Sequence, residues 1–196
     1  MDGMQAYQKE RLENTLLFFA LEHYKKTKKH PSQTVLYKYL AFFEFRYLDK
    51  TGTMPLELTY KAMKNGPVPL EIYDKRSQPG AFSTVEFEPF VTHTGNRGFL
   101  VKPKGKFNPV FFADAELEEM QDLIEIFAQQ WVSASVMSDA SHESLLAWKK
   151  TYAKKPDAII DPKDGFKRDI TAVPPETLSS AEERYLIHRK IAALAK

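Results

Sequence analysis

Residues 33–49 constrain the fold most, because apolar side chains occur on nearly every side of the helix that their spacing predicts. These side chains are Val35, Leu36, Tyr39, Leu40, Phe42, Phe43, Tyr47 and Leu48. A helix that is apolar all round is buried inside a domain rather than laid on its surface. The other elements are therefore expected to pack around this one.

The remaining segments predict several further helices and one small sheet. Helices are expected over about residues 5–28, 56–64, 69–76, 115–131, 133–139, 143–153 and 181–195. Residues 82–113 contain short β-rich runs, including residues 109–113, with a turn at residues 94–98. The predicted fold class is mainly α (α+β): a compact helical domain around a central buried helix, with a small antiparallel β-sheet insert.

Local signals set the expected helix ends. Asp114 is a candidate N-cap, and Ser141 is a candidate cap for the helix over residues 143–153. Ser180 and Glu183 have the spacing of a capping box. The buried side of the helix over residues 115–131 is predicted to be Leu117, Met120, Leu123, Ile124, Phe127 and Trp131. The apolar side of the last helix is predicted to be Tyr185, Ile187, Ile191 and Leu194.

Residues 65–69 (Asn-Gly-Pro-Val-Pro) predict a rigid corner. Gly66 tolerates the left-handed conformation that ends a helix. Pro67 and Pro69 each favour an extended conformation in the residue before them. Pro69 also suits the first position of a new helix, because proline has no N–H to leave unpaired there.

Composition indicates one globular unit. Apolar residues make up 43% of the 196 residues, which is enough for a sizeable core. Residues 1–155 are predicted to form the helical domain, including the β-rich insert over about 82–113. Residues 156–196 are predicted to be a wrapping loop and terminal helix of the same globule. The polar start of the chain and the lack of a long apolar run lead us to expect a soluble, cytoplasmic protein.

Charge indicates a mixed surface. The formal net charge of +2 is small for a protein dedicated to nucleic-acid binding. Four basic side chains nevertheless gather on the predicted sheet and after it: Arg97, Lys102, Lys104 and Lys106. This basic ribbon keeps open an alternative function, a nucleic-acid-binding regulator, although few aromatic residues accompany it for base stacking. The six acidic residues between Asp114 and Glu125 are a solvated face or a place for a basic partner.

No catalytic or metal-binding pattern is found in the sequence. Cysteine is absent, and His142-Glu143 lacks the second histidine of a zinc helix because Leu146 stands in its place. The five histidines, at positions 23, 30, 93, 142 and 188, are scattered. Ser141, His142 and Glu143 are adjacent, so their side chains point in different directions and do not form a triad. We therefore predict no enzyme activity, no catalytic residue, no metal and no cofactor.

Two residues of the second half of the chain are nonetheless assigned a role. His142 is interpreted as a buried histidine that satisfies backbone groups near a helix start, with a partner contact or a hydrolase residue as the alternatives. Trp148 is interpreted as an anchor of the core.

Two segments about seventy residues apart resemble one family, the SocA-like or GepA-like phage-associated proteins with a Panacea antitoxin domain. The first is the elbow from Ala62 to Pro69, followed by Tyr73, and the second runs from Ser133 to Trp148. The chain departs from the family pattern in two places. Ser141 stands where threonine is common, and the elbow lacks an aromatic residue before its Gly-Pro pair.

The resemblance implies a non-enzymatic role. Members of the family neutralise toxins mainly by direct protein contact, and one branch delivers its toxin to a protease. The implied partners are a cognate toxin encoded nearby and, in that branch, a protease. Residues 82–113 or 155–196 are candidates for a segment that sets specificity. The motif residues implied to be structural or in contact with the partner are Gly66, Pro67, Val68, Pro69, Tyr73, His142 and Trp148.

Overall fold

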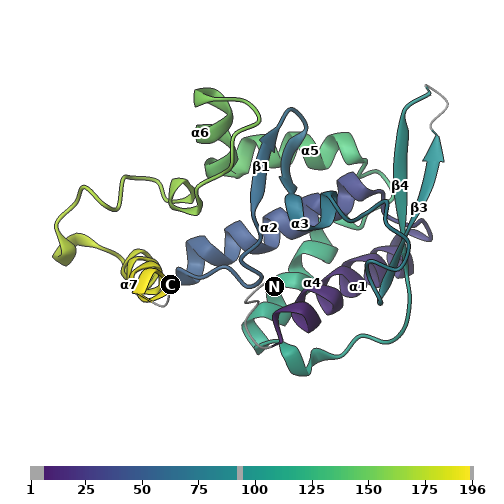
Figure 1. Cartoon of the computed structure of the whole chain (residues 1–196), viewed down its shortest axis with the longest axis horizontal. Coiled ribbons are helices and arrows are strands. Elements are labelled where there is room, and N and C mark those ends of the chain that lie inside the picture. The colour runs from purple at the N-terminus through teal and green to yellow at the C-terminus, as the bar shows by residue number, and fades with distance from the viewer. Residues whose placement is uncertain (1–6, 92–94, 195–196) are drawn as a thin grey trace.

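The computed structural model describes residues 7–91 and 95–194, which form seven α-helices and two separate two-stranded sheets (Figure 1). The helices are α1 (Gln8–Thr27), α2 (Gln33–Thr51), α3 (Leu70–Tyr73), α4 (Asp114–Phe127), α5 (Ala134–Ser144), α6 (Leu146–Lys154) and α7 (Ser180–Leu194). The strands are β1 (Tyr60–Met63), β2 (Gly66–Pro69), β3 (Val85–Val91) and β4 (Arg97–Pro103). The predicted fold class, mainly helical with a small antiparallel β component, is confirmed. None of the described helices is both long and apolar enough to cross a membrane.

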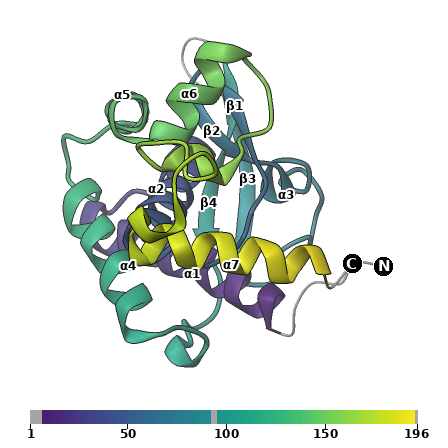
Figure 2. The same cartoon turned by 90° about the vertical axis from the view of Figure 1, so that its left-hand side faces the viewer.

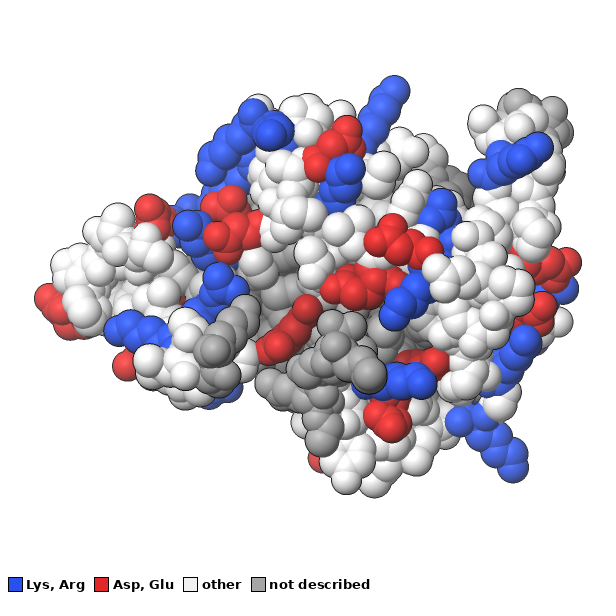
Figure 3. Space-filling view, viewed as in Figure 1, with Lys and Arg blue, Asp and Glu red and all other residues white. Residues whose placement is uncertain are grey.

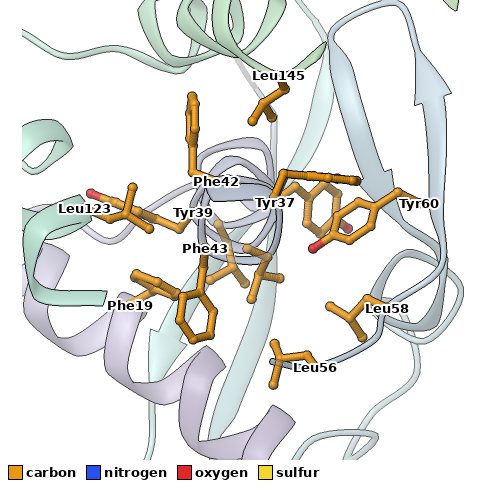
Figure 4. Close-up of a cluster of buried hydrophobic side chains, with 14 of the residues drawn as sticks. Phe19, Tyr37, Tyr39, Phe42, Phe43, Leu56, Leu58, Tyr60, Leu123 and Leu145 are labelled. Atoms are coloured by element: carbon orange, nitrogen blue, oxygen red, sulfur yellow. The ribbon is translucent and has the colours of Figure 1, made fainter. Parts of the chain in front are cut away.

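Helix α2 is the centre of the core, as the sequence predicts. Figure 4 shows its side chains pointing outwards on all sides, towards α1, α4 and β1. On one side, the ring of Tyr39 stacks on Phe19 of α1 with a centroid distance of 4.8 Å. On another side, Phe42 stacks on Phe127 of α4 at 4.7 Å. Burial of large aromatic rings on opposite sides of one helix supplies much of the apolar area that stabilises the fold.

The helix predicted over residues 56–64 is wrong, because residues 57–59 have no regular structure and residues 60–63 form β1. The buried carboxylate of Glu44 accepts hydrogen bonds from the N–H groups of Leu56 (3.0 Å) and Leu58 (3.4 Å). Farther along, β1 pairs with β2 on one side and makes backbone hydrogen bonds to residues 157–160 on the other. These partners are distant in sequence and override the local helical propensity.

The elbow is extended, as predicted, but the helix after it is shorter than predicted. β2 covers the Gly-Pro-Val-Pro run, and α3 follows directly. Pro69 is the N-cap of α3 rather than its first helical residue. Hydrogen-bonded turns, rather than regular helix, continue through Arg76.

The predicted insert does contain an antiparallel hairpin, formed by β3 and β4. Thr94, in the predicted turn, lies outside the described residues. The strand predicted over residues 109–113 is wrong, because Pro109–Phe111 form a short 3-10 helix that starts with a cap from Asn108. β4 is joined to the α1–α2 connection by the N–H of Val101, which donates to the carbonyl of Pro31 (2.8 Å).

Helix α4 begins as predicted but ends at Phe127, four residues early. Its N-cap is Ala113 rather than Asp114, and the carboxylate of Glu116 accepts the N–H of Ala113 (2.8 Å). Trp131 lies beyond the helix and is 73% exposed, so its predicted place on the buried side is wrong. The helical spacing continues through Trp131, and no local signal in the sequence marks the helix end at Phe127.

Helix α7 also differs from the prediction. Its capping box consists of Ser179 and Glu182, one residue earlier than predicted. Tyr185 is buried, whereas the other side chains predicted for the apolar side are exposed: Ile187, Ile191 and Leu194. Figure 2 shows α7 crossing the end of α2. A Cβ at Gly52, which ends α2, would overlap the carbonyl oxygen of Ala181, so the two helices approach closely there.

Acid is expected to destabilise the fold through His23, which is buried in α1 and lies 3.0 Å from the hydroxyl of Tyr39. Burial lowers the pKa of His23 from 6.5 to about 4. Because the pKa is lower in the folded state, the contribution of His23 to the free energy of unfolding is fully present above pH 6.5. This contribution is lost as the pH falls towards 4. The expected loss is about 3 kcal/mol by pH 4.

Urea unfolding of wild type and His23→Gln at several pH values measures this effect. The variant is expected to lose markedly less stability between pH 6.5 and pH 4, while both proteins unfold two-state. Equal losses in the two proteins would show that His23 is not the titrating group.

Candidate functional site

The two family-like segments meet in space. The β1–β2 hairpin packs on α2, and it also contacts α5 through β2 and α6 through β1 (Figure 1). The indole N–H of Trp148 in α6 donates a 3.0 Å hydrogen bond to the carbonyl of Met63 in β1. Trp148 is 6% exposed and belongs to the hydrophobic core. We call the group formed by Lys38, Gly66, Ser141, His142 and Trp148 the hairpin cluster.

Three rings stack in a row at this junction. The ring of His142 lies parallel to Trp148 with a centroid distance of 4.1 Å, and Trp148 stacks on Tyr152 at 4.8 Å. His142 is in the last turn of α5, not near a helix start as predicted. Its Nε2 is buried without a hydrogen-bond partner, so the predicted role in satisfying backbone groups is wrong. Its contact with Trp148 instead joins α5 to α6.

Gly66 is required by both the turn and the packing. It follows the two-residue loop of the hairpin with a φ of +103°, a conformation that favours glycine. A Cβ at this position would overlap the ammonium of Lys38 and lie 2.7 Å from Oγ of Ser141. The glycine therefore lets β2 lie directly against α2 and α5.

Lys38 is a buried cation beneath the hairpin. Its side chain projects from α2 and is 1% exposed. None of the ion pairs formed by the described residues includes Lys38. Desolvation lowers the pKa of Lys38 to about 7. Partial burial lowers the pKa of His142, and the nearby charge of Lys38 lowers it further.

The cluster does not have the geometry of a nucleophilic site. Oγ of Ser141 donates to the carbonyl of Ser138 (2.7 Å) and is fully covered. Since Ser141 lies inside α5, it is not the predicted cap of α6. Glu143 is exposed, whereas His142 stacks on Trp148, so the three adjacent residues face different surroundings. In this conformation a substrate has no access to Ser141 or Lys38.

The other motif residues support the hairpin. Pro67, Val68 and Pro69 are all buried in β2. Tyr73 is partly buried at the end of α3, and the guanidinium of Arg76 lies 3.5 Å from the centre of its ring. Tyr73 and His142 are thus partly buried, whereas the other motif residues are buried.

Sequence reasoning missed Lys38. The available signal was a lysine within a helix that is apolar on nearly every side, where a cation is expected to be buried. Glu44, which is also in α2 and fully buried, carried the same signal.

The acidic stretch in α4 is partly neutralised by the chain itself. Glu116 pairs with Arg11 (2.6 Å), and buried Glu119 pairs with Arg46 (2.7 Å) and with Lys50. Both glutamates are buried, so the stretch is not a continuous solvated face. This pairing reduces the negative charge that α4 could offer to a basic partner.

The basic ribbon is likewise partly paired. Lys102 pairs with Glu88, and Lys104 pairs with Glu86 (2.9 Å), across the β3–β4 hairpin. Figure 3 shows basic and acidic side chains interspersed on the face that it draws. This pairing weakens the case for a phosphate-binding strip, because cross-strand carboxylates compete with phosphate for the same cations. In the described residues, no three histidine or acidic side chains form a group able to hold a metal ion, and His93 lies outside them.

The family match covers both of the segments that meet at the hairpin cluster. The family model described as "Antitoxin SocA-like, Panacea domain" matches residues 36–149, which include the whole hairpin cluster. No curated protein and no solved structure matches the chain. The match begins in α2 and ends one residue after Trp148, so it covers most of the core and more than half of the chain. The chain therefore belongs to the SocA-like antitoxin family that is characterised by the Panacea domain.

Proposed function

We propose that this protein neutralises a cognate toxin by direct protein–protein binding. The observation that carries the proposal is the family match over residues 36–149, which coincides with the rigid core around α2 and the hairpin cluster. In this mechanism the core holds a binding surface in place, and the bound toxin is blocked from its target. No bond-making step is required of the chain, which makes the proposed role non-enzymatic.

The motif residues in this proposal are mainly structural. Gly66, His142 and Trp148 hold the hairpin against α2, α5 and α6 rather than touching the toxin. Gly66 and Trp148 are buried and His142 is partly buried, which supports this role, since a partner reaches only exposed atoms. The surfaces that contact the toxin are then expected elsewhere, in segments that differ between antitoxins.

Residues 155–196 are the candidate for an added element on the same globule. Residues 157–160 hydrogen-bond to β1, and α7 packs on α2, so this segment is tied to the family core. A related proposal is that the chain delivers its toxin to a cytoplasmic protease. That version predicts a fall in toxin level as well as a loss of toxicity.

The proposed function predicts that co-expression with the toxic product of an adjacent gene restores growth. The two proteins are then expected to co-elute as one complex in size-exclusion chromatography. Toxin levels measured over time after translation is stopped separate blocking from proteolysis, because only proteolysis shortens the lifetime of the toxin.

The control is Trp148→Ala, which removes the bond to Met63 and two stacked ring contacts and should abolish rescue by unfolding the core. An exposed substitution in the same helix, Lys149→Met, should leave rescue intact. If no adjacent gene product is toxic or binds the chain, the proposed function is wrong.

A further inference from the structure

An unpaired strand edge with a groove beside it lies outside the hairpin cluster. The groove, of about 340 Å³, lies between β3 and residues 76–82. Figure 2 shows β3 with β4 on one side and α3 on the other. The apolar lining of the groove includes Phe82, Val85, Phe87 and Phe99. The rings of Phe82 and Phe87 have a centroid distance of 5.4 Å.

Two hydrogen bonds determine which backbone groups of the hairpin face outwards. The N–H of Lys104 donates to the carbonyl of Thr84 (2.6 Å), so this pair bonds within the hairpin. The N–H of Val101 instead donates away from β3, to the α1–α2 connection. Val101 is opposite Phe87 in the register. Because bonding direction alternates along antiparallel strands, the N–H and C=O of Phe87 point to the outer edge of β3.

The same alternation turns the backbone groups of Val85 away from β4, but Val85 is only 2% exposed. The accessible groups of this edge are therefore the N–H and C=O of Phe87 and the carbonyl of Pro89. Within residues 7–91 and 95–194, no hydrogen bond engages the outward N–H and C=O of Phe87. Pro89 has no N–H, so strand pairing along this edge ends there. The free edge is therefore short and coincides with the wall of the groove.

Arg76 supplies an unbalanced positive charge in the groove. Its guanidinium lies over the ring of Tyr73, and Nη1 donates to the carbonyl of Tyr73. Its Nε is buried without an acceptor, and Arg76 takes part in none of the ion pairs among the described residues. The other cation in the wall, Lys104, is already paired with Glu86. A carboxylate is the group that best satisfies an arginine fork beside an apolar surface.

We propose that this groove binds an extended segment of a partner protein, which adds a short strand to β3 and places a carboxylate against Arg76. Main-chain hydrogen bonds to a free edge supply affinity, and side-chain pockets supply selectivity. The inference rests on the proposed function only in taking the partner to be the toxin. Pairing with a second copy of β3 is disfavoured, because Glu86 of one copy would lie opposite Glu88 of the other.

Selection of random linear peptides on the immobilised full-length protein tests this site without knowledge of the toxin. The enriched peptides are expected to contain an Asp or Glu within a β-branched run. Fluorescence-anisotropy titration should show binding at least about tenfold weaker to Arg76→Gln. Arg97→Gln, which removes an exposed arginine on the same hairpin, should bind within about twofold of wild type.

A backbone measurement tests the added strand separately. With the enriched peptide bound, hydrogen exchange of the Phe87 amide is expected to slow about tenfold or more, because its outward N–H gains an acceptor. Melting temperatures of both variants within about 2 °C of wild type would establish that the fold is intact.

Three outcomes would overturn the site. In the first two, no peptide is enriched on wild type relative to Arg76→Gln, or the enriched peptides bind wild type and Arg76→Gln equally. In the third, the Phe87 amide is protected from exchange without peptide, to an extent that rises with protein concentration, as pairing between two copies of the chain would produce. A toxin complex unaffected by Arg76→Gln would also overturn it, while leaving the proposed function in place. Peptide binding that depends on Arg76, in a chain that binds no toxin, would instead contradict the proposed function alone.

Discussion

Replacing Lys38 with methionine is expected to raise the free energy of unfolding by about 4 kcal/mol near pH 7. The pKa of Lys38 falls from 10.5 to about 7 on folding, because burial removes water from its ammonium and no carboxylate replaces it. Methionine has a similar length and carries no charge, so it fills the same space without that penalty. Urea unfolding monitored by circular dichroism gives the difference.

The size of this effect depends on pH. A lowered pKa in the folded state means that wild type gains stability as the pH rises from 7 towards 10.5. The advantage of Lys38→Met should therefore shrink over that range. Lys149→Met, at an exposed lysine of α6, is the matched control and should change stability by less than about 0.5 kcal/mol. A lower melting temperature for Lys38→Met at pH 7 would mean that the ammonium stabilises the hairpin.

Replacing Gly66 with alanine is expected to destabilise the protein by about 4 kcal/mol, from a backbone contribution and a packing contribution of similar size. The backbone contribution arises because φ is +103°, and the packing contribution because Cβ would overlap the Lys38 ammonium and lie 2.7 Å from Oγ of Ser141. Thermal unfolding and urea unfolding both measure the loss.

Gly105 separates the two contributions. It has a φ of +93° but nothing within 4 Å of an added Cβ. Gly105→Ala should therefore show the backbone cost alone, about 1–2 kcal/mol. If Gly66→Ala costs no more than Gly105→Ala, the close contact between β2 and α2 does not limit the fold. In the Lys38→Met background, the cost at Gly66 is expected to fall, because the overlapping ammonium is removed.

Periodicity predicted the elements that bury one continuous face. The start and end of α2, the start of α4 and the pairing of β3 with β4 follow from local patterns and from turn residues within a few positions. The same reasoning misplaced residues 56–64 and 109–113. In the first case, Glu44 and residues 157–160 supply hydrogen bonds that hold the chain in a non-helical conformation, and no local pattern reports them.

The candidate site was only partly predictable. The two segments that carry the family resemblance are visible in the sequence, as is the glycine that the hairpin needs. Their convergence on Lys38 was not visible, because it depends on how β2 packs against α2 and α5. The groove was missed for a similar reason, since a free strand edge is defined by the partners that a strand lacks.

By itself, the sequence determined a helical domain around a buried central helix and membership of an antitoxin-like family, because apolar spacing and short motifs are local properties of a chain. Only the tertiary structure decided that the elbow is a hairpin over a buried lysine, that the acids of α4 are partly paired with the chain's own bases, and that β3 keeps an open edge beside Arg76. These features depend on contacts between residues far apart in the chain, where burial sets the pKa of Lys38 and packing leaves one strand edge unpaired.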